Sequence, residues 1–341
     1  MIPESKIQEI RTYLEKSENP LFFFDDDADG LCSYLLLQKK YDKGHGIAVK
    51  TGPVLDTKYL NKVEEYCPDL VVVLDKSSIT QEFIENVHVP IVWIDHHPVM
   101  NKKGVHYYNS KKYTKGVAEP TTAICYEVTK QDLWIAAAGS LADWYIPKFM
   151  NEAVKAYPDL IPKTKEVTDV LFKSEFGKLI NKLSFLLKGS TTEVKKRIYS
   201  LSKIETPYEL LKPETSRGKF LARALEKPER EYKIMLEKAK EVASNDKILL
   251  YTYPSTKNSY TAELSNEITY LFPDKLVIIA REKSGEMKMS LRSMNINIPE
   301  ILENALKDVK GYGGGHEHAC GSVVSLDDFN HFLDNIRNQI Q

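Results

Sequence analysis

The chain has 341 residues, of which 42% are hydrophobic and 28% charged, and its formal net charge at pH 7 is −1. This composition is ordinary for a folded globular protein and excludes collagen-like, low-complexity and intrinsically disordered classes. The opening MIPESKIQEI lacks the regions of a signal peptide, and no apolar run approaches the roughly 18 residues of a membrane span. We therefore expect a cytoplasmic protein without a membrane partner. The four cysteines are scattered beside apolar stretches without CxxC spacing, which predicts buried free thiols.

The first predicted strand, residues 21–24, ends in a run of acidic residues. Four of the next five residues carry carboxylates: Asp25, Asp26, Asp27 and Asp29. The helical spacing of apolar residues begins just after Gly30, so these carboxylates crowd the carboxyl end of the strand. Such a group is self-repelling unless a cation neutralises it, and the stretch therefore indicates a metal site.

Residues 1–147 form the first predicted domain. Four short apolar runs, LFFF, GIAVKTG, LVVVLD and VPIVWID, alternate with segments of helical spacing near residues 31–42, 56–65 and 80–87. This alternation is typical of an α/β fold with a mostly parallel sheet covered by helices. Ligands of such sheets bind at the carboxyl ends of the strands.

Further acidic residues follow the later strands of this domain. Asp75 ends LVVVLD, Asp95 ends VPIVWID and precedes His96 and His97, and Asp143 lies in AAAGSLADW. A single aspartate in such a place is ordinarily a helix cap or a turn residue. Repetition of the pattern, once as Asp-His-His, instead favours side chains that converge on one cleft. Carboxylates mixed with imidazole suit Mn²⁺ or a similar divalent ion.

Residues 118–146 predict two helices, and the chain then stays helical to about residue 245, with breaks at KGSTT and KIETPYELLKPETS. We interpret residues 148–245 as a helical bridge. Residues 148–240 hold 21 Lys and Arg against 13 Asp and Glu, an excess of +8, and the remainder of the chain carries −9. This basic stretch is either a solvated helical face or a surface that binds a polyanion.

Residues 246–341 predict a second, smaller α/β domain. Strand patterns occur in KILLYTYP, KLVIIARE and MKMSLRSM, with a helix near 260–271 and a closing helix in LDDFNHFLDNIRNQ. A glycine-rich segment, GGGHEHACG, occupies residues 313–321.

The motifs together resemble a known family. DADG after an apolar strand, LD at the end of a later strand, IDHHP and SLAD occur in the order of the four motifs of the DHH phosphoesterases. GGGHEHACG, preceded by SLRS, resembles the associated C-terminal domain of that family, DHHA1. The first motif, DADG, resembles that of the archaeal RecJ-like exonucleases. The length of the chain suits a member of the family with two domains.

The resemblance implies two divalent cations, with Mn²⁺ preferred and Mg²⁺ as the alternative. Asp75 would bridge them, with Asp27 on one ion and with Asp29, His96 and Asp143 on the other. Asp95 would orient an imidazole, and His97 would face the substrate phosphate. Relatives place a histidine where this chain has Phe23 or Asp25, and whether Asp25 replaces that ligand is left open.

The resemblance also implies that the second domain holds the substrate. Consecutive glycines let backbone N–H groups approach a phosphate, and nearby side chains add charge or hydrogen bonds. The residues expected to bind substrate are Arg292, Gly313, Gly314, Gly315, His316 and His318.

The leading hypothesis is an exonuclease that removes mononucleotides from single-stranded DNA or RNA, in a setting such as DNA repair. Tyr199, Tyr208 and Tyr232 in the basic bridge would offer stacking faces. A second reading keeps the chemistry on short oligonucleotides, cyclic dinucleotides or the phosphoadenosine nucleotide. A third is a scaffold subunit of a replication complex. A further alternative is an active enzyme that is tethered to a helicase or replisome protein through residues 148–240.

Overall fold

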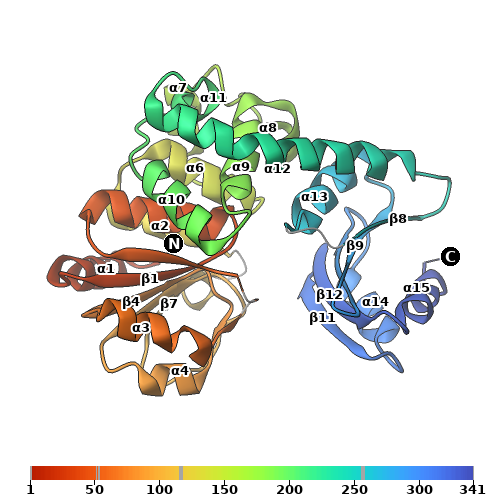
Figure 1. Ribbon diagram of the computed structural model, residues 1–341, viewed down its shortest axis with the longest axis horizontal. Coiled ribbons are helices and arrows are strands. Elements are labelled where there is room, and N and C mark those ends of the chain that lie inside the picture. Colours follow the sequence, from red (N-terminus) through yellow and green to blue (C-terminus); the bar gives the residue numbers. More distant parts are fainter. Residues whose placement is uncertain (1, 51, 53, 115–117, 255–257, 341) are drawn as a thin grey trace. The chain divides into compact units, whose positions relative to one another are not determined.

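A computed structural model describes residues 2–50, 52, 54–114, 118–254 and 258–340 (Figure 1). The chain divides into two compact units, Met1–Leu225 and Glu226–Gln341. The expected helical bridge, residues 148–245, spans this division. Within the described ranges, no helix is both long enough and apolar enough to cross a membrane.

The first unit is built on a five-stranded sheet in the order β2-β1-β4-β6-β7, in which every pairing is parallel. Its strands are β1 (Pro20–Asp25), β2 (His45–Val49), β4 (Leu70–Leu74), β6 (Ile91–Asp95) and β7 (His106–Asn109). The expected parallel sheet is confirmed, and each apolar run contributes a strand. The edge strand β7 was not expected, because its short sequence HYYN lacks a continuous apolar run.

The strand order explains where the acidic residues meet. β1 pairs with β2 on one side and with β4 on the other. The chain therefore passes from one side of β1 to the other between β2 and β4. The carboxyl ends of β1 and β4 therefore lie at the point where the strand order reverses, which is the ligand-binding position in doubly wound sheets. Asp25 and Asp75 stand at these two strand ends.

Helices cover both faces of this sheet (Figure 1). Leu21 and Phe23 of β1 pack with Phe83 in one core cluster, whereas Phe22 and Phe24 contact the ring of Tyr34. This alternation along one strand is the period of two that a pleated strand imposes. The helices concerned are α1 (Glu4–Lys16), α2 (Ala28–Tyr41), α3 (Leu60–Tyr66), α4 (Gln81–Asn86), α5 (Thr121–Thr129) and α6 (Leu133–Ala142). Short elements complete this part: β3 (Val54–Leu55), β5 (Ser78–Ile79), and the 3-10 helices η1 (Thr57–Tyr59) and η2 (Ser110–Lys112).

The middle of the chain is helical, as predicted. Its helices are α7 (Met150–Ala156), α8 (Val167–Lys173), α9 (Glu175–Leu186), α10 (Thr191–Leu201), α11 (Tyr208–Leu211) and α12 (Ser216–Glu241). Both predicted breaks are present, although α11 forms one short turn inside the second. Ser190 begins α10 with a capping box to Glu193, which explains why KGSTT separates two helices.

The second unit holds a five-stranded sheet in the order β11-β12-β10-β9-β8, parallel only between β8 and β9. Its strands are β8 (Ile248–Tyr253), β9 (Leu276–Lys283), β10 (Glu286–Arg292), β11 (Gly311–His316) and β12 (Ala319–Ser325). Its helices are α13 (Thr261–Leu271), α14 (Ile298–Ala305) and α15 (Phe329–Arg337). The predicted α/β character is confirmed. All four cysteines are free, but Cys67 is exposed, so burial was wrongly expected for that thiol.

Candidate metal centre

The acidic run occupies a tight connection from strand to helix. Asp25 is the last residue of β1, and Asp27 is the N-cap of α2, where its carboxylate accepts the backbone N–H of Gly30 at 2.9 Å. Asp29 lies in the first turn of that helix. A Cβ atom on Gly30 would lie 2.6 Å from the backbone of Asp25, so only glycine permits this close turn. The connection places the three carboxylates within a few residues of one another.

The start of α5 fixes the side chain of Asp29. Its two carboxylate oxygens accept the backbone N–H groups of Thr121 and Thr122 at 2.9 and 2.8 Å. These are helix N-terminal donors, which favour a carboxylate. The Thr121 hydroxyl also donates to Asp75 Oδ1 at 3.1 Å. Sequence reasoning missed both threonines, although the PTT at the start of a predicted helix is a recognisable signal.

Asp75 lies directly after β4 and is only 2% exposed. Its φ of +59° is left-handed, a conformation that costs an L-residue roughly 1–2 kcal/mol. Its backbone N–H donates to the carbonyl of Ile94 at 3.0 Å, which holds this end of β4 against β6. The backbone is thus held in an unfavourable conformation at a residue that faces the other acids.

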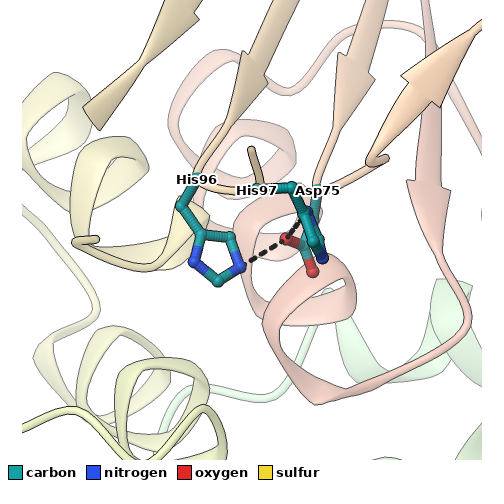
Figure 2. Close-up of side chains that lie close together, drawn as sticks. All are labelled: Asp75, His96 and His97. Carbon is teal, nitrogen blue, oxygen red and sulfur yellow. Dashed lines mark ion pairs between the residues drawn. The ribbon is translucent and has the colours of Figure 1, made fainter. Parts of the chain in front are cut away.

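His96 lies close to three carboxylates, and Figure 2 shows it beside one of them, Asp75, together with His97. Its Nε2 lies 3.3 Å from Asp75 Oδ1, 3.2 Å from Asp143 Oδ2 and 3.9 Å from Asp29 Oδ2. Asp143, just beyond α6, is the most exposed of these three carboxylates. The structure therefore gathers carboxylates from three separate segments around one imidazole nitrogen.

Asp95 orients the second imidazole. His97 Nδ1 donates to Asp95 Oδ1 at 2.7 Å, while Tyr107 and Asn109 donate to Asp95 Oδ2 at 3.0 Å each. Burial lowers the pKa of His97, but the hydrogen bond and charge of Asp95 outweigh it and leave the pKa raised. The neighbours Tyr107 and Asn109 come from the edge strand β7, which sequence reasoning did not include.

Burial and mutual repulsion disfavour the ionised carboxylates. Desolvation and the neighbouring carboxylates raise the pKa of Asp75 well above its usual value. The same causes raise the pKa of Asp29 to about 6, although His96 and Thr122 oppose the shift. Asp27 keeps an exposed surface, yet surrounding protein atoms still desolvate its carboxyl group and raise its pKa. A cation would relieve each of these costs.

The donor atoms fit a divalent cation. In the part of the chain that the structure describes, three groups of side chains place one ligand atom each within 4.8 Å of one another: Asp25, Asp27 and Asp75; Asp29, His96 and Asp143; and Asp75, His96 and His97. Oxygen donors with one or two imidazoles suit Mn²⁺ and Mg²⁺ better than thiolate-seeking ions. The residues expected as ligands are thus all brought together, and Asp75 belongs to two of the groups.

The residues expected to bind substrate lie in the second unit. Gly313, Gly314 and Gly315 form part of the exposed edge strand β11 rather than a loop. Ala319 of β12 pairs with His316 on one side and with Arg292 on the other, so these two residues share one row across the sheet. His318 lies in the turn between β11 and β12, with Nδ1 3.3 Å from the carbonyl of Ile296.

The three tyrosines proposed for stacking differ in exposure. Tyr199 on α10 is 70% exposed, and Tyr208 is half-buried. Tyr232 is 7% exposed, and its hydroxyl donates to Glu267 at 2.5 Å. Tyr232 was therefore wrongly expected to offer a stacking face, because the apolar face of α12 turns it into the core.

Comparison with known proteins bears on the second unit first. Residues 245–341 match the family model of the DHHA1 domain. This segment is therefore similar to DHHA1 domains. Its sheet, with the edge strand GYGGGH, is the sheet described above. No match to this chain was found among curated proteins.

Solved structures show that the whole chain has the fold of RecJ. RecJ from Thermus thermophilus in complex with Mn²⁺ is 16% identical, with a TM-score of 0.70, over 98% of this chain and 54% of that protein. An exonuclease RecJ bound to manganese is 17% identical, with a TM-score of 0.64, over 99% and 94%. The DHH domain of a member of the S1p family of ribosomal proteins is 13% identical, with a TM-score of 0.69, over 99% and 90%. This chain thus spans about half the length of the Thermus protein. The expected likeness to DHH/DHHA1 proteins is confirmed for the fold and for the DHHA1 domain.

Proposed function

We propose that this protein is a metal-dependent phosphodiesterase that acts as an exonuclease on single-stranded DNA or RNA and releases mononucleotides. The observation that carries the proposal is the convergence of Asp29, Asp75 and Asp143 on His96, at the strand ends of a RecJ fold. Two RecJ structures that share this fold contain manganese. We extend that preference to this chain, with Mg²⁺ as the alternative.

The proposed roles follow from the geometry. Asp75 is the shared member of two ligand groups, and Asp29 is held in place by the start of α5. Bound divalent cations would activate a water and offset the negative charge that develops on the phosphate. Water then forms a new P–O bond as the ester P–O bond breaks, and the leaving oxygen takes a proton. No side-chain nucleophile is needed.

His97 is proposed to face the phosphate. Asp95 holds its Nδ1, so Nε2 is the ring nitrogen not engaged by that hydrogen bond. The raised pKa of His97 favours the cationic imidazole, which donates a strong hydrogen bond to a phosphate oxygen. Arg292, Gly313–Gly315, His316 and His318 are proposed to hold the substrate, and the basic residues of 148–240 to attract a longer strand.

The test uses end-labelled single strands of DNA and RNA, incubated with Mn²⁺, with the products resolved over time. A ladder that shortens by one nucleotide at a time is expected. His96→Ala protein purified in the same way serves as the control against a contaminating nuclease. Absence of hydrolysis on every strand, and on a dinucleotide, would overturn the proposal and favour a scaffold role. Faster turnover of a dinucleotide than of a 20-mer would instead assign the short substrate.

A further inference from the structure

A buried lysine lies beside the acidic run. Lys76 directly follows Asp75, and it is 0% exposed. Its Nζ lies 2.6 Å from Asp25 Oδ1 and 2.7 Å from the carbonyl oxygen of Gly52. A buried ammonium is costly unless such acceptors surround it, so this lysine is fixed by the two bonds.

The backbone of Lys76 is also fixed. Its carbonyl accepts the indole N–H of Trp93 at 2.9 Å. Trp93 is fully buried and stacks on the ring of Tyr107, with the ring centroids 3.9 Å apart. Tyr107 in turn donates to Asp95, the residue that orients His97. Lys76 is therefore connected to His97 through Trp93, Tyr107 and Asp95. It is held in place, unlike a surface lysine whose side chain moves freely in solvent.

The lysine pairs with a carboxylate that belongs to one of the candidate ligand groups. Asp25, Asp27 and Asp75 form one of the three ligand groups, and the ammonium already occupies an oxygen of Asp25. A fixed positive charge at this place also repels a divalent cation. Among the residues that the structure describes, no lysine pairs with Asp29, His96 or Asp143.

We propose that Lys76 is a built-in cation that withdraws Asp25 from metal binding, so that the Asp25 group binds its ion more weakly than the His96 group. The inference rests on the proposed function, because it concerns the same metal centre. The role of Lys76 is positioning: it acts through Asp25 and touches no substrate. The proposal also bears on the histidine that relatives place where this chain has Phe23 or Asp25. Asp25 does not replace that ligand, because its carboxylate pairs with Lys76 and not with the metal.

The experiment is a titration of the metal-free protein with Mn²⁺, followed by calorimetry and by the electron paramagnetic resonance signal of free Mn²⁺. Wild-type protein is expected to bind one ion tightly and a second at least about tenfold more weakly. Lys76→Met is expected to tighten the weak site by about tenfold and to leave the tight site unchanged. Lys76→Gln, which keeps a donor for Asp25 and Gly52 without the charge, is expected to do the same.

Lys50→Met is the matched control. Lys50 Nζ lies 3.6 Å from Asp26, an acid of the same run that belongs to none of the three ligand groups. Its loss removes an equal charge nearby and is expected to change either affinity by less than about threefold. Thermal unfolding identifies which variants are folded.

Two equal Mn²⁺ affinities in the wild-type protein would overturn the proposal, and this result needs no variant. A folded Lys76→Met or Lys76→Gln protein whose weak site is unchanged would overturn it as well. Because the titration contains no nucleic acid, its outcome is independent of the exonuclease assay. A protein that binds Mn²⁺ as expected but cleaves nothing would reject the proposed function and retain the assignment of Lys76.

Discussion

The acidic cluster around His96 in the first unit differs from the edge strand β11 of the second unit above all in burial. Asp29 and Asp75 are each 2% exposed and are crowded by other carboxylates. Every residue of β11, from Gly311 to His316, is exposed. Burial makes charge expensive, so the cluster is suited to cations that neutralise it. An exposed residue can make and break a contact at a small free-energy cost, so β11 with His316 is suited to holding a substrate.

The comparison separates chemistry from binding. Groups that act on the reacting phosphate in the transition state control the turnover number, whereas groups that hold the substrate equally in both states control the Michaelis constant. We expect the acidic cluster around His96 to belong to the first class and the row of Arg292 and His316 to the second.

The largest effect is expected at Asp75. Asp75→Asn removes the charge shared by two ligand groups, and turnover is expected to fall by about a thousandfold or more at saturating substrate. Saturation kinetics in excess Mn²⁺ measure this. Asp26→Asn is the matched control, because Asp26 belongs to the same run but to no ligand group, and it should keep turnover within about threefold. Near-normal turnover of Asp75→Asn would remove the cluster from the mechanism.

A smaller effect is expected from salt. The excess of basic residues in 148–240 predicts that binding of a long single strand weakens steeply between 50 and 200 mM salt. Each phosphate contact is expected to contribute roughly 0.7 to the slope of the logarithm of the binding constant against the logarithm of the salt concentration. Hydrolysis of a dinucleotide, which is too short to follow this stretch, should respond less. Binding assays and initial rates over the same salt series measure the two slopes. Equal slopes would mean that the basic stretch is a solvated surface.

Much of this arrangement was predictable from the sequence because the signals were local. Apolar runs that end in Asp25, Asp75 and Asp95 predict strand ends, and in a parallel sheet those ends meet at one edge. The row formed by Arg292 and His316 was less accessible, since it depends on the register of three strands.

The missed residues that contact Asp29 and Asp25 act across long sequence separations. Thr121 and Thr122 reach Asp29 from a helix that begins 92 positions later. Lys76 reaches back 51 positions to Asp25, and nothing in LVVVLDK shows that its side chain turns inward. Tyr232 was misjudged for a related reason, because only tertiary packing decides which face of α12 is buried. Periodicity identifies elements, but it does not identify their partners.

Loss of either side chain in the row of Arg292 and His316 is expected to raise the Michaelis constant by about a factor of ten. Arg292→Ala and His316→Ala should each raise it while turnover at saturation stays measurable. Arg292 Nε donates to Asn266 at 3.0 Å, so thermal unfolding must accompany the kinetics. Lys288→Ala, on the same strand but outside the row, should leave the Michaelis constant unchanged. If turnover and Michaelis constant change together, the row also positions the reacting phosphate, and the division between chemistry and binding is less sharp.

The smallest expected effect, a few degrees in melting temperature, concerns the cost of burying the cluster without a cation. The pKa of Asp29 is raised to about 6 from an ordinary value of 3.8, so its ionisation destabilises the fold. That cost is absent below about pH 4 and present in full above about pH 6. The raised pKa of His97 acts in the same direction, because its contribution is present below its ordinary pKa and lost as pH rises through the raised one. Metal-free protein should therefore lose stability from pH 5 to pH 7.5.

Mn²⁺ binds the ionised carboxylates, so it should raise the melting temperature more at pH 7.5 than at pH 5. Differential scanning fluorimetry with Mn²⁺ or with a chelator measures this. Asp26→Asn should keep the Mn²⁺ shift and Asp75→Asn should lose most of it, whereas an equal shift at both pH values would show that the cluster is not where the ion binds.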